Sequence, residues 1–193
     1  MKIFLVFSMM LMFIFSSVKE ENTLIDAAAA DNNALVVCSQ TGMQIRLDNS
    51  DMKDYSRNLL KHSGKVLDTK MFAEIITNSS SVDTTGWKDG ELKNSLVVQN
   101  REEQISKEYM IRKLNITGSK QLRFFLRIIS NYNLSGSSER NIFYFSKPVY
   151  SNSGKYAVVQ WENRHNGSGG GGISLYRLQE NQWKEIGLVS SWK

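Results

Sequence analysis

The clearest hydrophobic pattern lies in the C-terminal part of the chain, where short apolar segments alternate with turn residues. Residues 142–146 form an aromatic-rich segment, and in residues 156–162 a period of two would set Tyr156, Val158 and Gln160 opposite Ala157, Val159 and Trp161. This period is typical of strands, and Gly or Asn-rich turns separate them. The pattern predicts four antiparallel strands joined locally into a meander: 142–146, 156–162, 172–178 and 183–190.

Upstream of the meander the apolar positions recur with a helical period. Asp68 can cap a helix in which Met71, Phe72, Ile75 and Ile76 share one face. A second stripe runs from Leu122 to Tyr132, and a shorter one from Ile105 to Leu114. The predicted fold is therefore α+β, with helices in the N-terminal two thirds packed on one face of the C-terminal antiparallel meander.

The remaining segments carry weaker patterns. Residues 22–33 contain an alanine run and are expected to be a linker or a short helix, while Met43, Ile45 and Leu47 alternate with polar residues as in a strand. Asp51 can cap a helix that reaches Leu60. A loop is expected over residues 79–90 and a short strand over 96–98.

The N-terminus has the pattern of a secretory signal peptide. Lys2 precedes an apolar run over residues 3–15, and small residues at 16–18 precede three charged residues. Because a membrane-spanning helix needs about 20 apolar residues, the run is too short to be a comfortable span. We expect residues 1–18 to be removed and residues 19–193 to fold as one exported domain, periplasmic, in the outer envelope or secreted, with no integral membrane span.

Charge and cysteine content narrow the partners that the domain can have. The formal charge is +5 with a pI near 9.3, but the basic residues are scattered among acids and form no run. Arg123 and Arg127 flank two phenylalanines, a pattern also seen at nucleic-acid surfaces, yet the helical spacing of the apolar residues favours a core helix with solvated arginines. We therefore expect no nucleic-acid partner, and a protein or a saccharide instead. The single cysteine, Cys38, cannot form an internal disulfide and is expected to pack in the core.

The most unusual feature is the glycine-rich segment from Asn163 to Gly172. Glycine allows backbone N–H groups to approach an anion, but phosphate cradles run from a strand into a helix, and this segment runs between two predicted strands. A flexible hairpin connection over residues 163–171 is the favoured interpretation, and contact with a ligand is the alternative. Ser168 stands between glycines but lacks the strand-turn-helix setting of a nucleophile.

Four residues beside this segment are the candidate binding residues: Trp161, Glu162, Arg164 and His165. His165 near Glu162 would permit acid–base chemistry close to neutral pH. Trp161, with Phe143, Phe145 and Trp183, would form a sugar-stacking surface if exposed, although strand aromatics more often belong to the core. The two histidines have no carboxylates at ligand spacing, so the sequence predicts no metal site, and it predicts no cofactor.

The C-terminal quarter resembles a set of small exported proteins known mostly from Bacteroidota genomes. The resemblance rests on an aromatic-Ser-Lys-Pro motif at 145–148, a Gly-Lys-Tyr-Ala motif at 154–157, the glycine run and the pair Trp183-Lys184. Many members of that set carry cysteines where this chain has residues 163–172, so no shared disulfide or redox feature is implied. The resemblance implies the fold and an exported location and no activity.

Two functions remain open on the sequence. The first is a non-catalytic cell-envelope or periplasmic protein that serves as a binding or interaction module. The alternative is a secreted enzyme that uses His165 and Glu162 near the glycine-rich segment. A concave pocket in which His165 and a carboxylate converge would favour the enzyme.

Overall fold

The computed structural model describes residues 23–40, 43, 45, 47, 50, 53, 55, 68–165 and 168–193. Its strands are β1 (Val36–Cys38), β2 (Leu96–Val98), β3 (Ile142–Phe145), β4 (Val149–Tyr150), β5 (Tyr156–His165), β6 (Ser168–Gln179) and β7 (Gln182–Trp192). The helices are a helix over residues 23–31, α3 (Thr69–Ser79), α4 (Lys107–Lys113) and α5 (Ser119–Leu134), with a short 3₁₀ helix η1 at Asp89–Glu91. No helix among these residues is long and apolar enough to cross a membrane.

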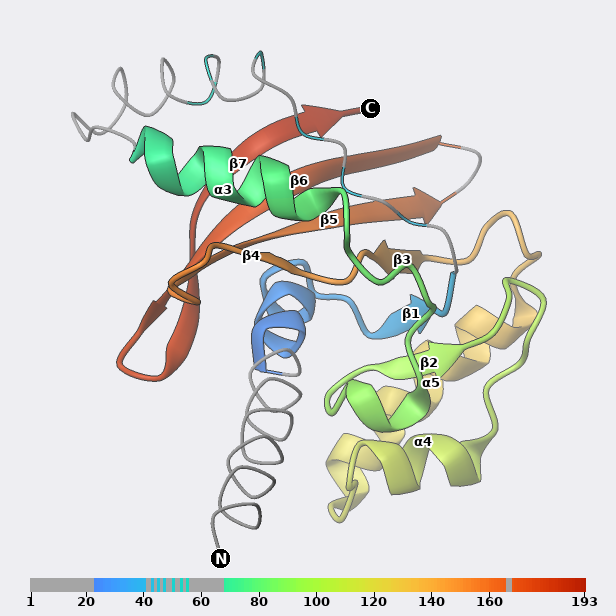
Figure 1. Cartoon of the computed structure of the whole chain (residues 1–193). Coiled ribbons are helices and arrows are strands. Elements are labelled where there is room, and N and C mark those ends of the chain that lie inside the picture. Colours follow the sequence, from blue (N-terminus) through green and yellow to red (C-terminus); the bar gives the residue numbers. More distant parts are fainter. Residues whose placement is uncertain are drawn as a thin grey trace, which may run out of the picture.

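The seven strands form one mixed sheet, in which the order along the main path is β2-β1-β3-β5-β6-β7 and β4 also pairs with β5 (Figure 1). β3, β5, β6 and β7 are antiparallel neighbours, as the sequence predicted. β1 is parallel to both β2 and β3.

The α+β class is thus confirmed, but two details of the predicted fold are wrong. The sheet is larger than a four-stranded meander, because the three-residue strands β1 and β2 extend it beyond β3 and β4 adds to β5. The helices are also not one N-terminal block, since β1 and β2 lie between them along the chain. The parallel pairings join segments far apart in sequence, so no local turn signal marks them.

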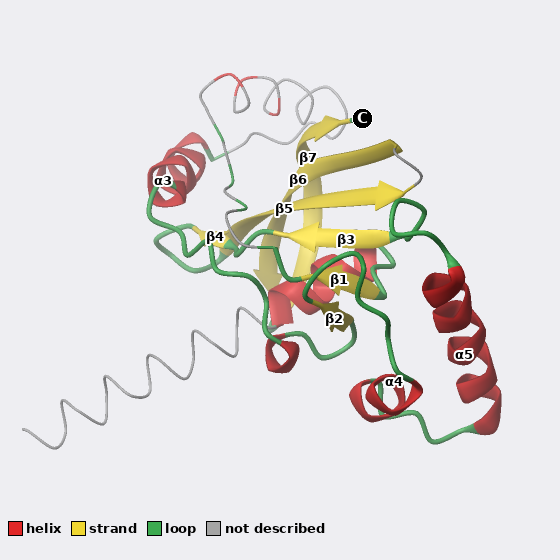
Figure 2. Cartoon of the chain, turned by 90° about the vertical axis from the view of Figure 1, so that its right-hand side faces the viewer, coloured by secondary structure: helices red, strands yellow, loops and turns green. Residues whose placement is uncertain are grey.

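Helices cover both faces of the sheet. The helix over residues 23–31 places Leu24, Ile25, Ala28 and Ala29 in a core cluster with Phe143, Phe145 and Val159, which are odd-numbered residues of β3 and β5. The even-numbered residues face the other helices: Ile142 and Tyr144 pack in a cluster with α4 and α5, and Val158 packs in a cluster with α3. Figure 2 shows α3 and the α4–α5 pair at separate parts of the sheet.

The structure confirms the two predicted helices that correspond to α3 and α5. Asp68 is the N-cap of α3, and its Oδ1 accepts hydrogen bonds from the backbone N–H groups of Lys70 and Met71 at 3.1 and 3.2 Å. α5 buries Ile129 and Tyr132 and leaves its arginines exposed, which agrees with a core helix.

Three weaker predictions have mixed outcomes. Residues 23–31 are a helix with a buried face and no linker. Met43, Ile45 and Leu47 are buried, as their alternation requires, yet none of the three is assigned to a strand. The predicted helix from Asp51 to Leu60 lies mostly outside the described residues, although residues 53 and 55 are helical.

The glycine-rich segment is the main correction to the predicted topology. Residues 163–171 are not a flexible connection: β5 continues through His165, and β6 begins at Ser168. Arg164 pairs with Gly169 and His165 pairs with Ser168, so residues 166 and 167, which lie outside the described residues, are all that separates the two strands. Strand propensity depends strongly on context, and here continuous pairing with β5, joined by pairing with β7 at Gly171 and Gly172, overrides the low intrinsic preference of the glycines.

Candidate ligand-binding site

The end of the β5–β6 hairpin contains all four residues that the sequence singled out, but the strand separates them into two pairs. Successive side chains of a strand point to opposite faces. Glu162 and Arg164 therefore lie on the even-numbered face of β5, and Trp161 and His165 lie on the odd-numbered face. The sheet stands between Glu162 and His165, so these two residues do not form the convergent acid–base pair of the enzyme alternative. His165 does share a recess of about 280 Å³ with another carboxylate, that of Glu139.

Opposite these residues β6 presents four consecutive glycines, Gly169 to Gly172, which pair with Arg164, Asn163, Glu162 and Trp161. Because glycine has no Cβ, β6 itself contributes no side chains to either face here. A recess of about 300 Å³ lies over the even-numbered face, and a wider one of about 650 Å³ lies over the odd-numbered face. Both volumes fall in the range of small-molecule sites.

The even-numbered recess is lined by Trp192, Glu162, Arg164 and Arg101, and it shares Asn163, Ser168, Gly169 and Gly170 with the odd-numbered recess. Arg164 donates a hydrogen bond to Glu162 at 2.8 Å, and its guanidinium lies over the ring of Tyr144, 4.7 Å from the centroid. Arg101 is tied to the chain by Nε, which donates to the carbonyl of Ser137 at 3.0 Å. Both guanidinium groups are thereby held in place before any ligand arrives.

The odd-numbered recess is lined by Trp161, Asn163, His165, Ser168 and Lys193, with Gly169 and Gly170 as its floor. Trp161 is partly buried, and its Nε1 donates to the Oγ of Ser174 at 3.2 Å, which fixes the indole. The Oδ1 of Asn163 is buried and has no hydrogen-bond partner among the described residues.

Packing explains three of the four glycines. A Cβ on Gly171 would lie 2.6 Å from the Trp192 indole, and a Cβ on Gly172 would lie 3.4 Å from the Trp161 indole and 2.8 Å from the carbonyl oxygen of Ser190. A Cβ on Gly169 would meet the carbonyl oxygen of Asn163 at 2.8 Å. The glycine strand is thus held between two indoles, one on each face.

Gly170 is different from its neighbours in the glycine strand. The only described atom within 4 Å of an added Cβ is the carbonyl oxygen of Trp192, at 3.3 Å. A contact of 3.3 Å with a backbone oxygen is tight, so little space is left for a side chain here, and the residue lines both recesses.

Elsewhere in the described part of the chain the chemistry-bearing residues have structural roles. Ser168 donates through Oγ to the carbonyl of His165 at 2.9 Å, a bond within its own hairpin. Cys38 is buried, as predicted, and burial raises the pKa of its thiol. No group of three or more metal-ligating side chains occurs among the residues that could be searched.

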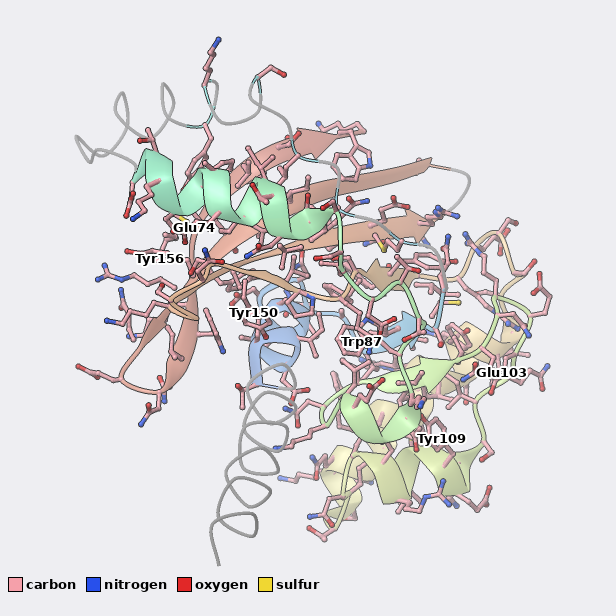
Figure 3. All side chains as sticks on the ribbon, viewed as in Figure 1. Glu74, Trp87, Glu103, Tyr109, Tyr150 and Tyr156 are labelled. Carbon is pink, nitrogen blue, oxygen red and sulfur yellow. The ribbon has the colours of Figure 1, made fainter. Side chains whose placement is uncertain are left out.

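The Ser-Lys-Pro motif at the end of β3 also has a structural role. Lys147 is buried with its ammonium 3.7 Å from the centroid of the Trp87 ring, and it forms an ion pair with Glu91 at 3.1 Å. Trp87 lies against the end of β3 (Figure 3) and donates through Nε1 to the carbonyl of Phe145 at 2.9 Å. Ser146 accepts a hydrogen bond from the N–H of Gln160. The motif therefore fixes the backbone at the point where the chain leaves β3.

Sequence reasoning missed four residues that line the two recesses: Asn163, Trp192, Arg101 and Lys193. Alternation along a strand extended to His165 would have placed Asn163 between Trp161 and His165 on one face. The other three reach the hairpin only through the tertiary fold, so no spacing in the sequence marks them. In comparisons with known proteins, no family model, no curated protein and no solved structure matches the chain.

Proposed function

We propose that this chain is an exported, non-catalytic binding module of the cell envelope or periplasm, related to the small Bacteroidota proteins that its C-terminal motifs resemble. Its ligand site is the glycine-floored end of the β5–β6 hairpin. The observation that carries the proposal is a strand of four glycines in full register, which leaves a recess on each face beside fixed tryptophan and arginine side chains.

Three features favour binding over catalysis. The indoles of Trp161 and Trp192 are held against backbone, which suits stacking on a flat ligand. The guanidinium groups of Arg101 and Arg164 are tethered and offer fixed hydrogen-bond donors. Glu162 and His165 lie on opposite faces, so neither recess brings together an acid and a base from the candidate residues.

A saccharide is the ligand class that this combination favours. Sugars present hydroxyl groups at their edges and an apolar face of C–H groups, which match polar side chains beside an indole. A protein partner would need a larger contiguous surface than either recess supplies.

The proposal is tested by calorimetric titration of the purified domain with chitotriose, cellotetraose and trigalacturonate. Two variants separate the recesses: Trp161→Leu removes an indole that lines only the odd-numbered one, and Arg164→Leu removes one of the two guanidinium groups of the even-numbered one. Gly90→Val is the matched control, because a Cβ at Gly90 meets nothing within 4 Å and Gly90, in η1, lines neither recess. Saturable binding that is lost in at least one recess variant and kept in the control supports the proposal. Absence of binding to all three probes, or binding that survives both variants, contradicts it.

The exported location has its own test. Mass spectrometry of the protein recovered from its host is expected to give a mature chain that begins between about Ser17 and Asn22, because the apolar run ends before the first charged residues. A mature product that retains Met1 would contradict export by signal cleavage.

A further inference from the structure

The outward face of α5 carries cations and apolar side chains and no acid. Its exposed basic residues are Lys120, Arg123 and Arg127, and its 16 residues include no Asp or Glu. At about 100° per residue, these cations share an arc of about 100° with Phe124 and Leu134. Phe124 is 52% exposed, and Leu134, at 86%, has the largest exposed fraction among the exposed large apolar residues of the described chain. Figure 2 shows α5 at the periphery, with the sheet and α4 on its inner side, so this face is open to solvent.

The positive charge of this face is not neutralised within the described part of the chain. There, none of the three basic side chains forms an ion pair or a side-chain hydrogen bond. Arg123 stands three positions from Lys120 and four from Arg127, and like charges at these spacings destabilise a helix. Lys120 also lies in the first turn, where the helix macrodipole disfavours a cation. These charges therefore oppose the stability of the helix that carries them.

The neighbouring helix α4 shows the arrangement that stabilises a helix. It has Glu108 in its first turn, Arg112 and Lys113 in its last turn, and Ser106 as a side-chain cap. Lys113 is also paired with Asp89 at 2.9 Å. In α5 the first turn has no acid, the last turn has no base and the N-cap has no side-chain bond. Natural sequences break such local rules chiefly at functional sites, so the charge on α5 points to a partner.

We propose that the outward face of α5 binds the surface of a lipid bilayer that contains anionic lipids. The inference goes beyond the proposed function and is independent of the hairpin site. The three cations complement anionic headgroups, while Phe124 and Leu134 reach the boundary between headgroups and acyl chains. The helix lies along the membrane and does not enter it further, because Ile129 and Tyr132 hold its opposite side in the core.

The two apolar residues favour a membrane over a soluble polyanion. A nucleic acid can stack its bases on aromatic rings, and an acidic polysaccharide can bind the cations, but neither offers an apolar environment to the aliphatic side chain of Leu134. Phe124 is exposed and yet fixed, because its ring makes an edge contact with Phe125 at 5.3 Å between centroids, and Phe125 packs on the core. The acid nearest to α5 along the chain, Glu139, lies beyond its C-terminal end, where it lines a recess with Asn131.

Two multiple variants divide the face into its two components. Lys120→Gln, Arg123→Gln and Arg127→Gln together remove the charges and keep a residue of good helix propensity at each position. Phe124→Gln and Leu134→Gln together remove the apolar side chains and keep the charges. The matched control removes the same number of positive charges from exposed lysines outside α5, by the substitutions Lys70→Gln, Lys155→Gln and Lys184→Gln.

The protein purified from its host is sedimented with vesicles of phosphatidylcholine alone and with vesicles of an equimolar mixture with phosphatidylglycerol. All variants share one N-terminus, so any contribution of residues 1–18 is the same in each. The wild type is expected to bind the mixed vesicles and not the neutral ones. Each basic residue contributes about fivefold to partitioning, so the charge variant should bind roughly 100-fold less. The apolar variant should lose at least about tenfold, and the control should stay within about twofold of the wild type.

A spectroscopic variant locates the contact directly. Phe124→Trp keeps an aromatic ring on the face, and acyl chains labelled with bromine should quench its fluorescence beyond the quenching seen in the wild type. Circular dichroism checks that each variant is folded. If the charge variant unfolds, Arg127→Gln alone takes its place, with an expected loss of about fivefold.

Four results would each overturn the proposal: no binding of the wild type to the mixed vesicles, an equal loss in the control, unchanged binding in the apolar variant, or no added quenching in Phe124→Trp. Polygalacturonate and double-stranded DNA are titrated in parallel. If either binds the wild type and the apolar variant as tightly as the wild type binds vesicles, the partner is a soluble polyanion and the membrane assignment fails. The proposed ligand site at the hairpin stands or falls separately, because none of these substitutions touches it.

Discussion

An alanine scan of the glycine strand tests the register on which the site depends. The informative pair is Gly170→Ala and Gly171→Ala, since the two positions are adjacent and the substitution is the same. At Gly171 an added Cβ would lie 2.6 Å from the Trp192 indole and 2.7 Å from the carbonyl oxygen of Trp161. At Gly170 it would have one neighbour, at 3.3 Å.

Two opposing terms set the expected magnitudes. Replacing glycine with alanine in a strand favours the folded state by about 0.5–1 kcal/mol, because the unfolded chain loses conformational freedom. Overpacking a site that must move backbone or a fixed ring costs about 1–3 kcal/mol. Gly171→Ala is therefore expected to lose about 1–2 kcal/mol net. Gly170→Ala is expected to stay within about 0.5 kcal/mol of the wild type.

The assay is urea denaturation of the mature domain followed by far-ultraviolet circular dichroism. The midpoint is expected to fall for Gly171→Ala at an unchanged m value, which indicates a change in stability and not in the amount of surface exposed on unfolding. Gly172→Ala should behave like Gly171→Ala, because the carbonyl oxygen of Ser190 lies 2.8 Å from its added Cβ. Equal and small effects at all three positions would mean that the segment is the flexible connection suggested by its composition, and would refute the paired strand.

The remaining predictions concern the core and acid stability. Trp183→Ala should lower the free energy of unfolding by about 3–5 kcal/mol in urea melts, because the ring is buried in the core cluster. Trp183→Phe should lower it less, since the buried Nε1 that it removes has no partner among the described residues. Burial alone would raise the pKa of Asp89, but hydrogen bonds from Tyr109 and Lys113 lower it. Because the pKa of Asp89 is lower in the folded state, its carboxylate stabilises the fold at pH values above its unfolded pKa of about 3.9. This contribution is lost as the pH falls through the pKa of the folded state. Urea melts between about pH 2 and 5 should therefore show that acidification lowers the free energy of unfolding less in Asp89→Asn than in the wild type. An equal loss in both proteins would contradict the lowered pKa of Asp89.

The parts of the fold that the sequence predicted are those with a local signal. The cap of α3 at Asp68 and the apolar stripe of α5 each depend on residues a few positions apart. β1 and β2 have three residues each and pair in parallel with segments far along the chain, so period and turn chemistry carry no information about them. The helix over residues 23–31 was uncertain for a similar reason. Its alanines matter because they allow close packing on the sheet, and this contact is tertiary.

The candidate site was predicted in position but not in arrangement. Trp161, Glu162, Arg164 and His165 do lie at the glycine-rich hairpin, yet treating residues 163–171 as a loop concealed the alternation that divides them between two faces. The error came from applying the low strand propensity of glycine without the cross-strand partners that override it. Trp192 and Arg101 join the site through β7 and through the connection after β2, which sequence spacing does not reveal.

The energetics of the hairpin end link its stability to its function. A glycine in a strand costs about 0.5–1 kcal/mol relative to alanine, and an unpaired buried amide oxygen costs about 1–3 kcal/mol. At Gly171 and Gly172 the first cost is offset by the two indoles that the glycines admit. At Gly170 the offset is smaller, the carbonyl oxygen of Trp192 at 3.3 Å from an added Cβ, and its cross-strand partner Asn163 has a buried Oδ1 without a partner among the described residues. Natural sequences violate local rules of this kind chiefly at functional sites. Asn163→Leu should therefore leave the domain at least as stable as the wild type in urea melts, because it removes a buried oxygen that has no partner, and a clear loss of stability would contradict this account of the hairpin end.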